Sequence, residues 1–217
     1  VGVEALARFH SPTQGSVSPE VFIPQVARAN LMTEFARLMF EKILADVPSV
    51  WRMYGEGCRI SVNISPLLFL QEGFTGYIKA RLDESGIAPH TFMLEITEAV
   101  FVHDMDRVIG IITELSDFGV GISLDDFGKG YSSLYYISHI PLHELKIDRG
   151  FVTDISRDER SFGLFKAICA VADVYSFKVV AEGVEHLEQV DRLKLTSCSI
   201  AQGFYYARPA LLPDQGL

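Results

Sequence analysis

Short apolar runs recur along the chain and alternate with longer stretches in which apolar residues follow helical spacing. The short runs predict strands of a parallel sheet, which are buried on both faces, and the longer stretches predict helices. The predicted strands cover 1–6, 59–63, 92–95, 121–125, 144–148, 178–182 and 199–204. The predicted helices cover 19–29, 33–47, 73–84, 105–118, 133–139, 160–175 and 187–195, with Ser18 and Thr33 as candidate caps of the first two.

Strands that alternate with helices are typical of a parallel α/β architecture, either an open doubly wound sheet or a closed (β/α)8 barrel. Polar residues follow nearly every predicted strand, which favours a barrel mouth over the crevice of an open sheet. Only seven strands are predicted, so we expect the eighth to lie upstream of residue 1 or to be missing. The polar residues are Asn63, Glu95, Asp125, Asp126, Lys146, Asp148, Glu182 and Gln202, and Glu4 lies within the first predicted strand.

Composition and charge narrow the function classes. A chain of 217 residues suits one domain, expected over 1–217 as an N-terminally truncated part of a longer multidomain protein. The formal net charge of −9 has the wrong sign for a DNA or RNA polymer partner, although metal ions can still let an acidic site hold a phosphate compound. Cys58, Cys169 and Cys198 form no CxxC pair, which argues against a disulfide framework and a zinc site. No apolar run approaches the length of a membrane span.

The stretch ISLDDFGKGYSSL, residues 122–134, places two acids side by side at the end of a predicted strand. Side chains alternate between the faces of a strand, so Asp125 and Asp126 cannot both face one site while both are in regular strand. Asp126-Phe127-Gly128 spells a kinase motif, but the other kinase motifs are missing from the sequence. The Gly-Lys-Gly that follows matches no phosphate-binding loop.

Several carboxylates at one end of one barrel raise one another's pKa and cost stability unless cations are present. Such an oxygen-rich site suits Mg²⁺ or Mn²⁺, and two such ions support in-line attack on a phosphodiester. Lys146 and Asp148 share a strand face, and a lysine beside cations has a lowered pKa and can relay a proton. Ordinary alternatives exist for single residues: a salt bridge for Lys146, a first-turn acid for Glu98 and Glu185, and a surface cation for Arg8.

The motifs together resemble the EAL domains, phosphodiesterases that hydrolyse the bacterial second messenger cyclic di-GMP. The resemblance begins with Glu4-Ala5-Leu6 followed by Arg8 and continues in family order over essentially the whole chain. Phe9, where the family usually has Trp, and Lys129, where it has a small residue, are the departures. The further matching motifs are 18–24, SVNIS at 61–65, LEITE at 94–98, DDFG at 125–128, GYSS at 130–133, LKID at 145–148, AEGVE at 181–185, and Gln202-Gly203 before Pro209.

The resemblance implies a modified TIM barrel whose first, antiparallel strand would precede residue 1. It also implies two divalent cations, Mg²⁺ or Mn²⁺, bridged by Asp125. Lys146 is implied to assist the water with Asp148 beside it, and Glu98 to hold the loop after the two aspartates. One metal would be held by Glu4, Asn63, Glu95 and Asp125, the second by Asp125, Asp126 and Glu182, and the substrate would contact Leu6, Arg8, Glu185, Gln202 and Gly203.

The expected function is therefore metal-dependent hydrolysis of cyclic di-GMP to linear pGpG. The alternative is a catalytically inactive receptor that binds the nucleotide, but receptors of this family usually lose metal ligands and this chain keeps each one. The resemblance also implies a homodimer and fusion to a sensory or GGDEF domain. We expect a cytoplasmic domain whose parent protein can be tethered to the inner membrane.

Overall fold

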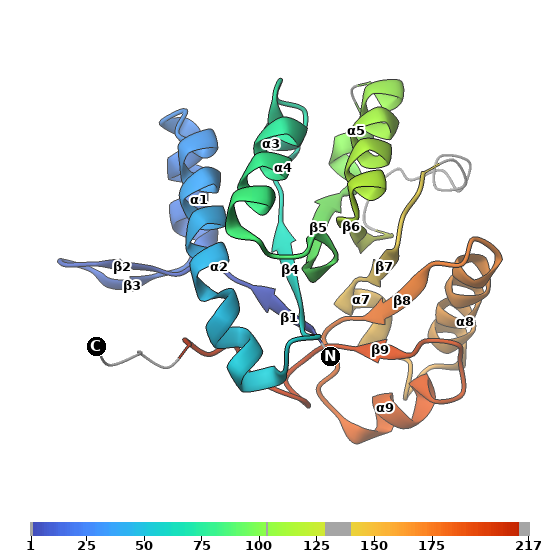
Figure 1. The fold of residues 1–217 in the computed structure, drawn as a ribbon. Helices are drawn as coiled ribbons and strands as arrows, with labels where there is room; N and C mark the ends of the chain where they lie inside the picture. Colours follow the sequence, from blue (N-terminus) through green and yellow to red (C-terminus); the bar gives the residue numbers. More distant parts are fainter. Residues whose placement is uncertain (1, 103, 129–139, 213–217) are drawn as a thin grey trace.

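The computed structural model describes residues 2–102, 104–128 and 140–212 and contains one curved sheet of seven strands, all paired in parallel. The α/β prediction is therefore confirmed, and the sheet has the form of an incomplete barrel (Figure 1). The order of the strands across the sheet follows their order along the chain. The strands are β1 (Gly2–Ala5), β4 (Arg59–Asn63), β5 (Phe92–Thr97), β6 (Gly121–Phe127), β7 (Glu144–Ile147), β8 (Lys178–Ala181) and β9 (Ile200–Ala201).

Among the described residues, helices on the outside of the curved sheet connect successive strands except β6 and β7, as the alternating sequence pattern predicts (Figure 1). Their apolar faces bury residues such as Ile78, Ile112 and Phe165 against the strands. Burial of these faces, more than helix propensity, is what stabilises them. The helices are α1 (Pro19–Arg28), α2 (Met32–Tyr54), α3 (Pro66–Phe69), α4 (Phe74–Ser85), α5 (Met105–Phe118), α7 (Arg149–Val152), α8 (Glu159–Val174) and α9 (Leu187–Leu193), with 3₁₀ turns η1 (Pro89–Thr91) and η2 (Glu98–Val102).

The two faces of the strands differ in chemistry. Apolar residues such as Leu94, Leu124 and Leu145 are fully buried beneath the helices. The alternate positions face the interior of the curved sheet and include buried polar side chains, among them Glu95 and Lys146. Polar groups are thus concentrated on the concave side of the sheet.

Some local predictions need correction. The structure contains a small antiparallel hairpin, β2 (Phe9–Ser11) and β3 (Gly15–Val17), that we did not predict because its strands are too short to show a pattern. Helix α2 begins after Leu31, so Thr33 is not its cap. It also continues beyond Pro48, because burial of an apolar face on both sides of the proline outweighs the cost of the lost hydrogen bond.

The sheet ends at β1 on one side and at β9 on the other, and among the described residues no strand joins these two edges. An eighth strand upstream of residue 1 stays a prediction. The predicted helix at 133–139 and Lys129 lie outside the described residues. No described helix is both long enough and apolar enough to cross a membrane.

Candidate metal centre

A β-bulge in β6 brings the two adjacent aspartates to one site. Leu124 pairs with Leu145 and Phe127 with Ile147, so two residues of β6 stand opposite one residue of β7. Asp126 has φ +56°, a left-handed conformation that is uncommon outside glycine and that aspartate tolerates better than most residues. The strand therefore does not end at Asp125 as we expected. It continues to Phe127, and the bulge suspends the alternation that would separate the two carboxylates.

The bulge places both aspartates beside the acid that follows β8. One carboxylate oxygen from each of Asp125, Asp126 and Glu182 lies within 4.8 Å of the other two. This is the ligand set that the family resemblance implies for the second metal. Carboxylate oxygens gathered in this way suit hard divalent cations such as Mg²⁺ and Mn²⁺.

Lys146 lies among four carboxylates. Its Nζ is 2.8 Å from Glu182 Oε1 and 2.9 Å from Glu95 Oε2. Asp125 Oδ1 and Glu4 Oε2 follow at 3.5 Å and 3.7 Å. The Lys146 and Glu95 side chains are only 3% and 1% exposed, so the interaction is buried. The salt bridge that we left open as the ordinary alternative for Lys146 is present.

The charges of this cluster alter one another's pKa. Burial raises the pKa of Glu95 to about 7, against the opposing effect of Lys146. Burial likewise raises the pKa of Asp125 and of Glu182. Burial lowers the pKa of Lys146, but the surrounding carboxylates outweigh it and raise the pKa above its ordinary value. With carboxylates alone around it, Lys146 is thus a firmly charged cation, not the lysine of lowered pKa expected beside metal ions.

The metal-free protein is expected to lose stability as the pH rises through the range in which Glu95 ionises. Its pKa is raised from 4.5 to about 7, so the folded state holds this proton more tightly, and the stabilisation is lost as the pH rises from about 4.5 to about 7. Asp125 and Glu182 act in the same direction. Divalent cations bind the ionised carboxylates, so Mn²⁺ should raise the melting temperature more at pH 8 than at pH 5. Thermal denaturation at both pH values tests this, and equal shifts would contradict it.

Two of the ligands expected at the first metal, Glu4 and Asn63, are hydrogen-bonded to each other, and Glu4 also bonds to Gln202. Asn63 Nδ2 donates to Glu4 Oε1 at 2.8 Å, and Gln202 Nε2 donates to Glu4 Oε2 at 2.6 Å. Glu95 is instead bonded to Lys146. Glu4 thus connects β1, at one edge of the sheet, to the residue that follows β9 at the other edge.

The other predicted site residues lie in the loops around this cluster. Glu98 Oε1 accepts a hydrogen bond from the Gly128 N–H at 3.0 Å, a contact suited to the loop-holding role. Asp148 caps α7 by accepting from the Gly150 N–H at 2.8 Å. Arg8 and Leu6 are exposed in the segment after β1, and the Arg8 side chain donates a hydrogen bond to the Ala7 carbonyl. Glu185 forms an ion pair with Arg149 at 3.5 Å, and Gly203 directly follows Gln202.

Sequence reasoning missed two residues beside this site. Gln189 is only 2% exposed and bonds to the backbone of the loop that follows Glu182. The sequence signal that could have identified Gln189 is its place as the third residue of a predicted helix. In a capping box, a glutamine at this position accepts a hydrogen bond from the backbone N–H of the residue before the helix. Arg149 was missed because it immediately follows the LKID motif and reads as an ordinary surface cation.

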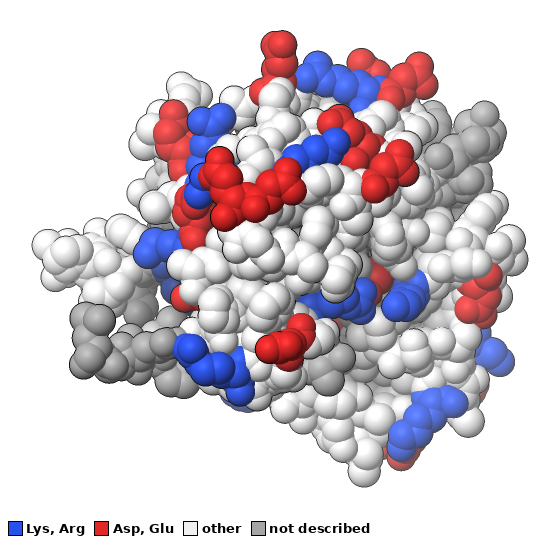
Figure 2. Space-filling view, in the orientation of Figure 1, with Lys and Arg blue, Asp and Glu red and all other residues white. Residues whose placement is uncertain are grey.

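An open cleft of about 2370 Å³ runs along the opening between β1 and β9. Its lining includes Glu4, Arg8, Asn63, Lys146 and Gln202. The cleft is larger than a typical small-ligand pocket, so its volume does not define a ligand. Figure 2 shows acidic and basic side chains interspersed over one face of the molecule without a continuous basic surface, which agrees with the negative net charge.

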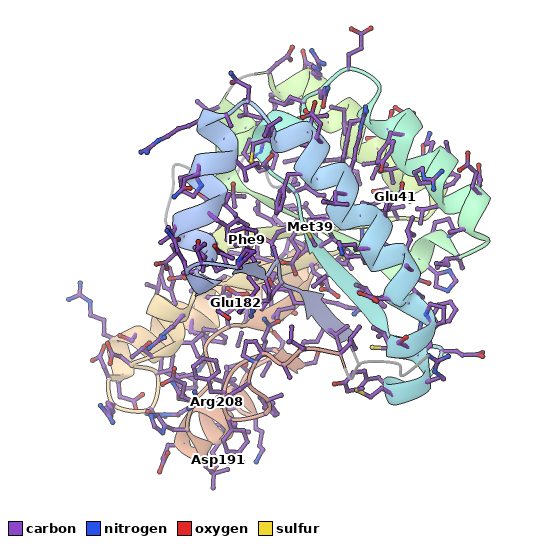
Figure 3. All side chains as sticks on the ribbon, turned by 90° about the vertical axis from the view of Figure 1, so that its left-hand side faces the viewer. Phe9, Met39, Glu41, Glu182, Asp191 and Arg208 are labelled. Carbon is purple, nitrogen blue, oxygen red and sulfur yellow. The ribbon has the colours of Figure 1, made fainter. Side chains whose placement is uncertain are left out.

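Figure 3 places Glu182 near the middle of the molecule, between the N-terminal elements above it and the C-terminal elements below it. Asp191, in α9, lies at the lower margin of the same view.

The chain resembles known proteins over nearly its whole length. The family model described as EAL domain matches residues 1–209. The bifunctional diguanylate cyclase/cyclic di-GMP phosphodiesterase MucR of Pseudomonas aeruginosa is 36% identical over 96% of this chain and 30% of that protein. The oxygen sensor protein DosP of Escherichia coli is 34% identical over 96% of this chain and 26% of that protein. The chain thus spans about a quarter to a third of the length of these curated relatives.

Solved structures agree with the sequence relatives. The PaMucR phosphodiesterase in its c-di-GMP complex matches with a TM-score of 0.89 and 35% identity, over 99% of this chain and 86% of that one. The EAL enzyme Bd1971, in a form bound to cAMP and cyclic di-GMP, matches with a TM-score of 0.90 and 29% identity, over 97% of this chain and 58% of that one. Both likenesses extend beyond the strands to the connecting helices, since they cover almost all of the chain.

Proposed function

The chain belongs to the EAL domain family, and we propose that it hydrolyses cyclic di-GMP to the linear dinucleotide pGpG with the help of two divalent cations, Mg²⁺ or Mn²⁺. The observation that carries the proposal is the carboxylate cluster of Asp125, Asp126 and Glu182 beside Lys146. A binding surface alone would not need this many partly buried acids, each of which costs stability.

The residues present fit a divalent metal centre. Three carboxylates offer oxygens within 4.8 Å of one another. Burial raises the pKa of Asp125 and Glu182, and bound cations would favour their ionised forms and lower the pKa again. We propose that Asp125 bridges two cations and that Asp126 and Glu182 complete the second site. Glu4, Asn63 and Glu95 would complete the first. When bound, such cations supply positive charge that stabilises the attacking and leaving oxygens of a phosphodiester.

The remaining residues would prepare the site for the substrate. Lys146 offsets the negative charge of the acids and, with Asp148 nearby, would orient the attacking water. Glu98 would hold the end of β6 through the Gly128 N–H, at 3.0 Å in the structure. The guanidinium of Arg8 suits a phosphate oxygen of the substrate. We assign the other nucleotide contacts to Leu6, Glu185, Gln202 and Gly203.

Turnover of cyclic di-GMP by the purified protein tests the proposal. With Mn²⁺ or Mg²⁺ present, chromatography should show one pGpG for each cyclic di-GMP consumed. Removal of the metal with EDTA should stop the reaction, and added Mn²⁺ should restore it. Cyclic di-AMP is the matched control substrate, since it has the same phosphodiester ring and differs only in the bases.

A nucleotide-binding receptor is the competing function, and the same material distinguishes the two. Binding of cyclic di-GMP by calorimetry without any pGpG over a long incubation would establish the receptor and refute the enzyme. The complete set of expected metal ligands in this chain favours the enzyme.

Family membership also leads us to propose a homodimer, and fusion in the full protein to a sensory or GGDEF domain. We further propose that the domain works in the cytoplasm, where its parent can be tethered to the inner membrane. Light scattering of the purified protein tests the dimer, which predicts twice the mass of 24.2 kDa.

A further inference from the structure

The loop between β8 and α9 carries Glu182 and Glu185, and most of its backbone N–H groups have identified partners. Two of these partners are backbone carbonyls. The Glu182 N–H donates to the Ile147 carbonyl at 3.1 Å, and the Val184 N–H donates to the Gln202 carbonyl at 3.0 Å. These bonds tie the start of the loop to the strands on either side.

The second half of the loop is held by one side chain, that of Gln189. Its Oε1 accepts from the Glu185 N–H at 2.8 Å and from the His186 N–H at 2.9 Å. A helix N-terminus leaves such donors without intrahelical partners, and a glutamine at this position often bonds one of them. Gln189 is 2% exposed, so water does not provide a substitute partner.

The other end of the same amide reaches a different segment. Gln189 Nε2 donates to the Val152 carbonyl at 3.0 Å and lies 3.4 Å from the Thr153 carbonyl. These carbonyls close α7, the short helix that Asp148 caps just after Lys146. A local helix cap would need only the Oε1 contacts. The Nε2 contacts add a link between the segment after β7 and the segment after β8.

A second contact between the two segments lies at the surface. Arg149 and Glu185 form an ion pair at 3.5 Å. The Arg149 side chain also packs directly over Gly183, where a Cβ would come within 2.5 Å of Arg149 Cγ. Because Arg149 is 62% exposed on its side chain, this ion pair contributes little. The buried amide of Gln189 is therefore the stronger of the two connections.

We propose that Gln189 is a positioning residue of the metal centre: its amide fixes the loop of Glu182 and Glu185 relative to the segment of Lys146 and Asp148. The inference rests on the proposed function and adds to it a residue that touches neither metal nor substrate. Outer partners of metal ligands commonly set affinity because they hold the ligands in place, and their loss costs about 10–100-fold.

The test compares Mn²⁺ binding by the wild type and Gln189→Met, measured from the electron paramagnetic resonance signal of free Mn²⁺. Methionine has a similar length and keeps the apolar contacts but makes none of the four contacts of the amide. We expect Mn²⁺ affinity to fall at least about tenfold. Gln71→Met is the matched control, because Gln71 accepts a bond from Thr33 in a different part of the structure. Ile112→Val removes one methylene group from the buried face of α5 and thus lowers the stability of the fold away from the site. This variant controls for a general loss of stability.

Hydrogen exchange supplies the structural readout. The Glu185 and His186 amides should lose protection in Gln189→Met and keep it in both controls. Lost protection with unchanged Mn²⁺ affinity would overturn the positioning role, as would an equal loss of affinity in Ile112→Val. A wild-type protein that binds no Mn²⁺ would refute the proposed metal-dependent function itself. A wild type that binds Mn²⁺ but does not hydrolyse cyclic di-GMP would refute the proposed hydrolysis. The Mn²⁺ affinities of the wild type and Gln189→Met would still decide the positioning role.

Discussion

Asp125→Asn is expected to abolish measurable hydrolysis of cyclic di-GMP, with a fall in kcat of more than about 100-fold. The estimate is a minimum, because loss of even an outer partner of a metal ligand costs about 10–100-fold. Asp125 is the residue shared by both proposed metal sites, and its Oδ1 also accepts the Asp126 N–H at 2.8 Å within the bulge. An amide oxygen can accept the same bond, so the backbone should be preserved while the bridging charge is lost.

The measurement is pGpG formation at saturating Mn²⁺, together with a Mn²⁺ binding isotherm. Asp117→Asn is the control, because it makes the same chemical change at an exposed position on α5. We expect the control to match the wild type in both measurements. Activity of Asp125→Asn within a few-fold of the wild type would rule out the bridging role. A loss of turnover with unaltered metal binding would rule out its role as a ligand.

Lys146→Met should produce the largest combined loss of stability and activity. Methionine fits the space but leaves the buried carboxylate of Glu95 without its cation, 2.9 Å away in the structure. Removal of one partner from a buried ion pair costs about 3–5 kcal/mol, which for a domain of this size corresponds to roughly 6 to 20 °C in melting temperature. Turnover should fall by at least about 100-fold if the ammonium also orients the attacking water.

The stability loss should depend on pH and metal in a defined direction. At pH 8 Glu95 is ionised and the loss is largest, whereas at pH 5 Glu95 is protonated and needs no cation. Mn²⁺ should raise the melting temperature of Lys146→Met more than that of the wild type, because it replaces the missing positive charge. Lys79→Met, which breaks the more exposed pair with Glu114, should change the melting temperature little. A variant of Lys146 as stable as the wild type at pH 8 would contradict the electrostatic account.

The sequence predicted the parallel sheet well, because short segments with apolar residues at their buried positions alternate with longer stretches of helical spacing. The bounds of β4 and α5 agree with the prediction at both ends. Short elements such as β2 were missed, since three residues carry no period that could be recognised.

The chemistry of the site was predictable as a set of residues but not as a geometry. Acids at the ends of parallel strands must converge at one edge of the sheet, so the grouping of Asp125 and Glu182 followed from order alone. The bulge did not follow, because the φ of Asp126 depends on how β6 pairs with β7. The raised pKa of Lys146 depends on four side-chain distances, which no sequence pattern contains. Gln189 escaped notice because it acts through backbone groups and contributes no charge.

The hydrogen bond between Gln202 and Glu4 has a consequence for how the protein is made. These residues are 198 positions apart, yet they meet at 2.6 Å beside Lys146. During synthesis at roughly 5–20 residues per second, Glu4 is incorporated about 10 to 40 s before its partner exists. The contact between the two edges of the sheet can therefore form only after Gln202 has been made, so the surroundings of Glu4 are completed late in the synthesis of this domain.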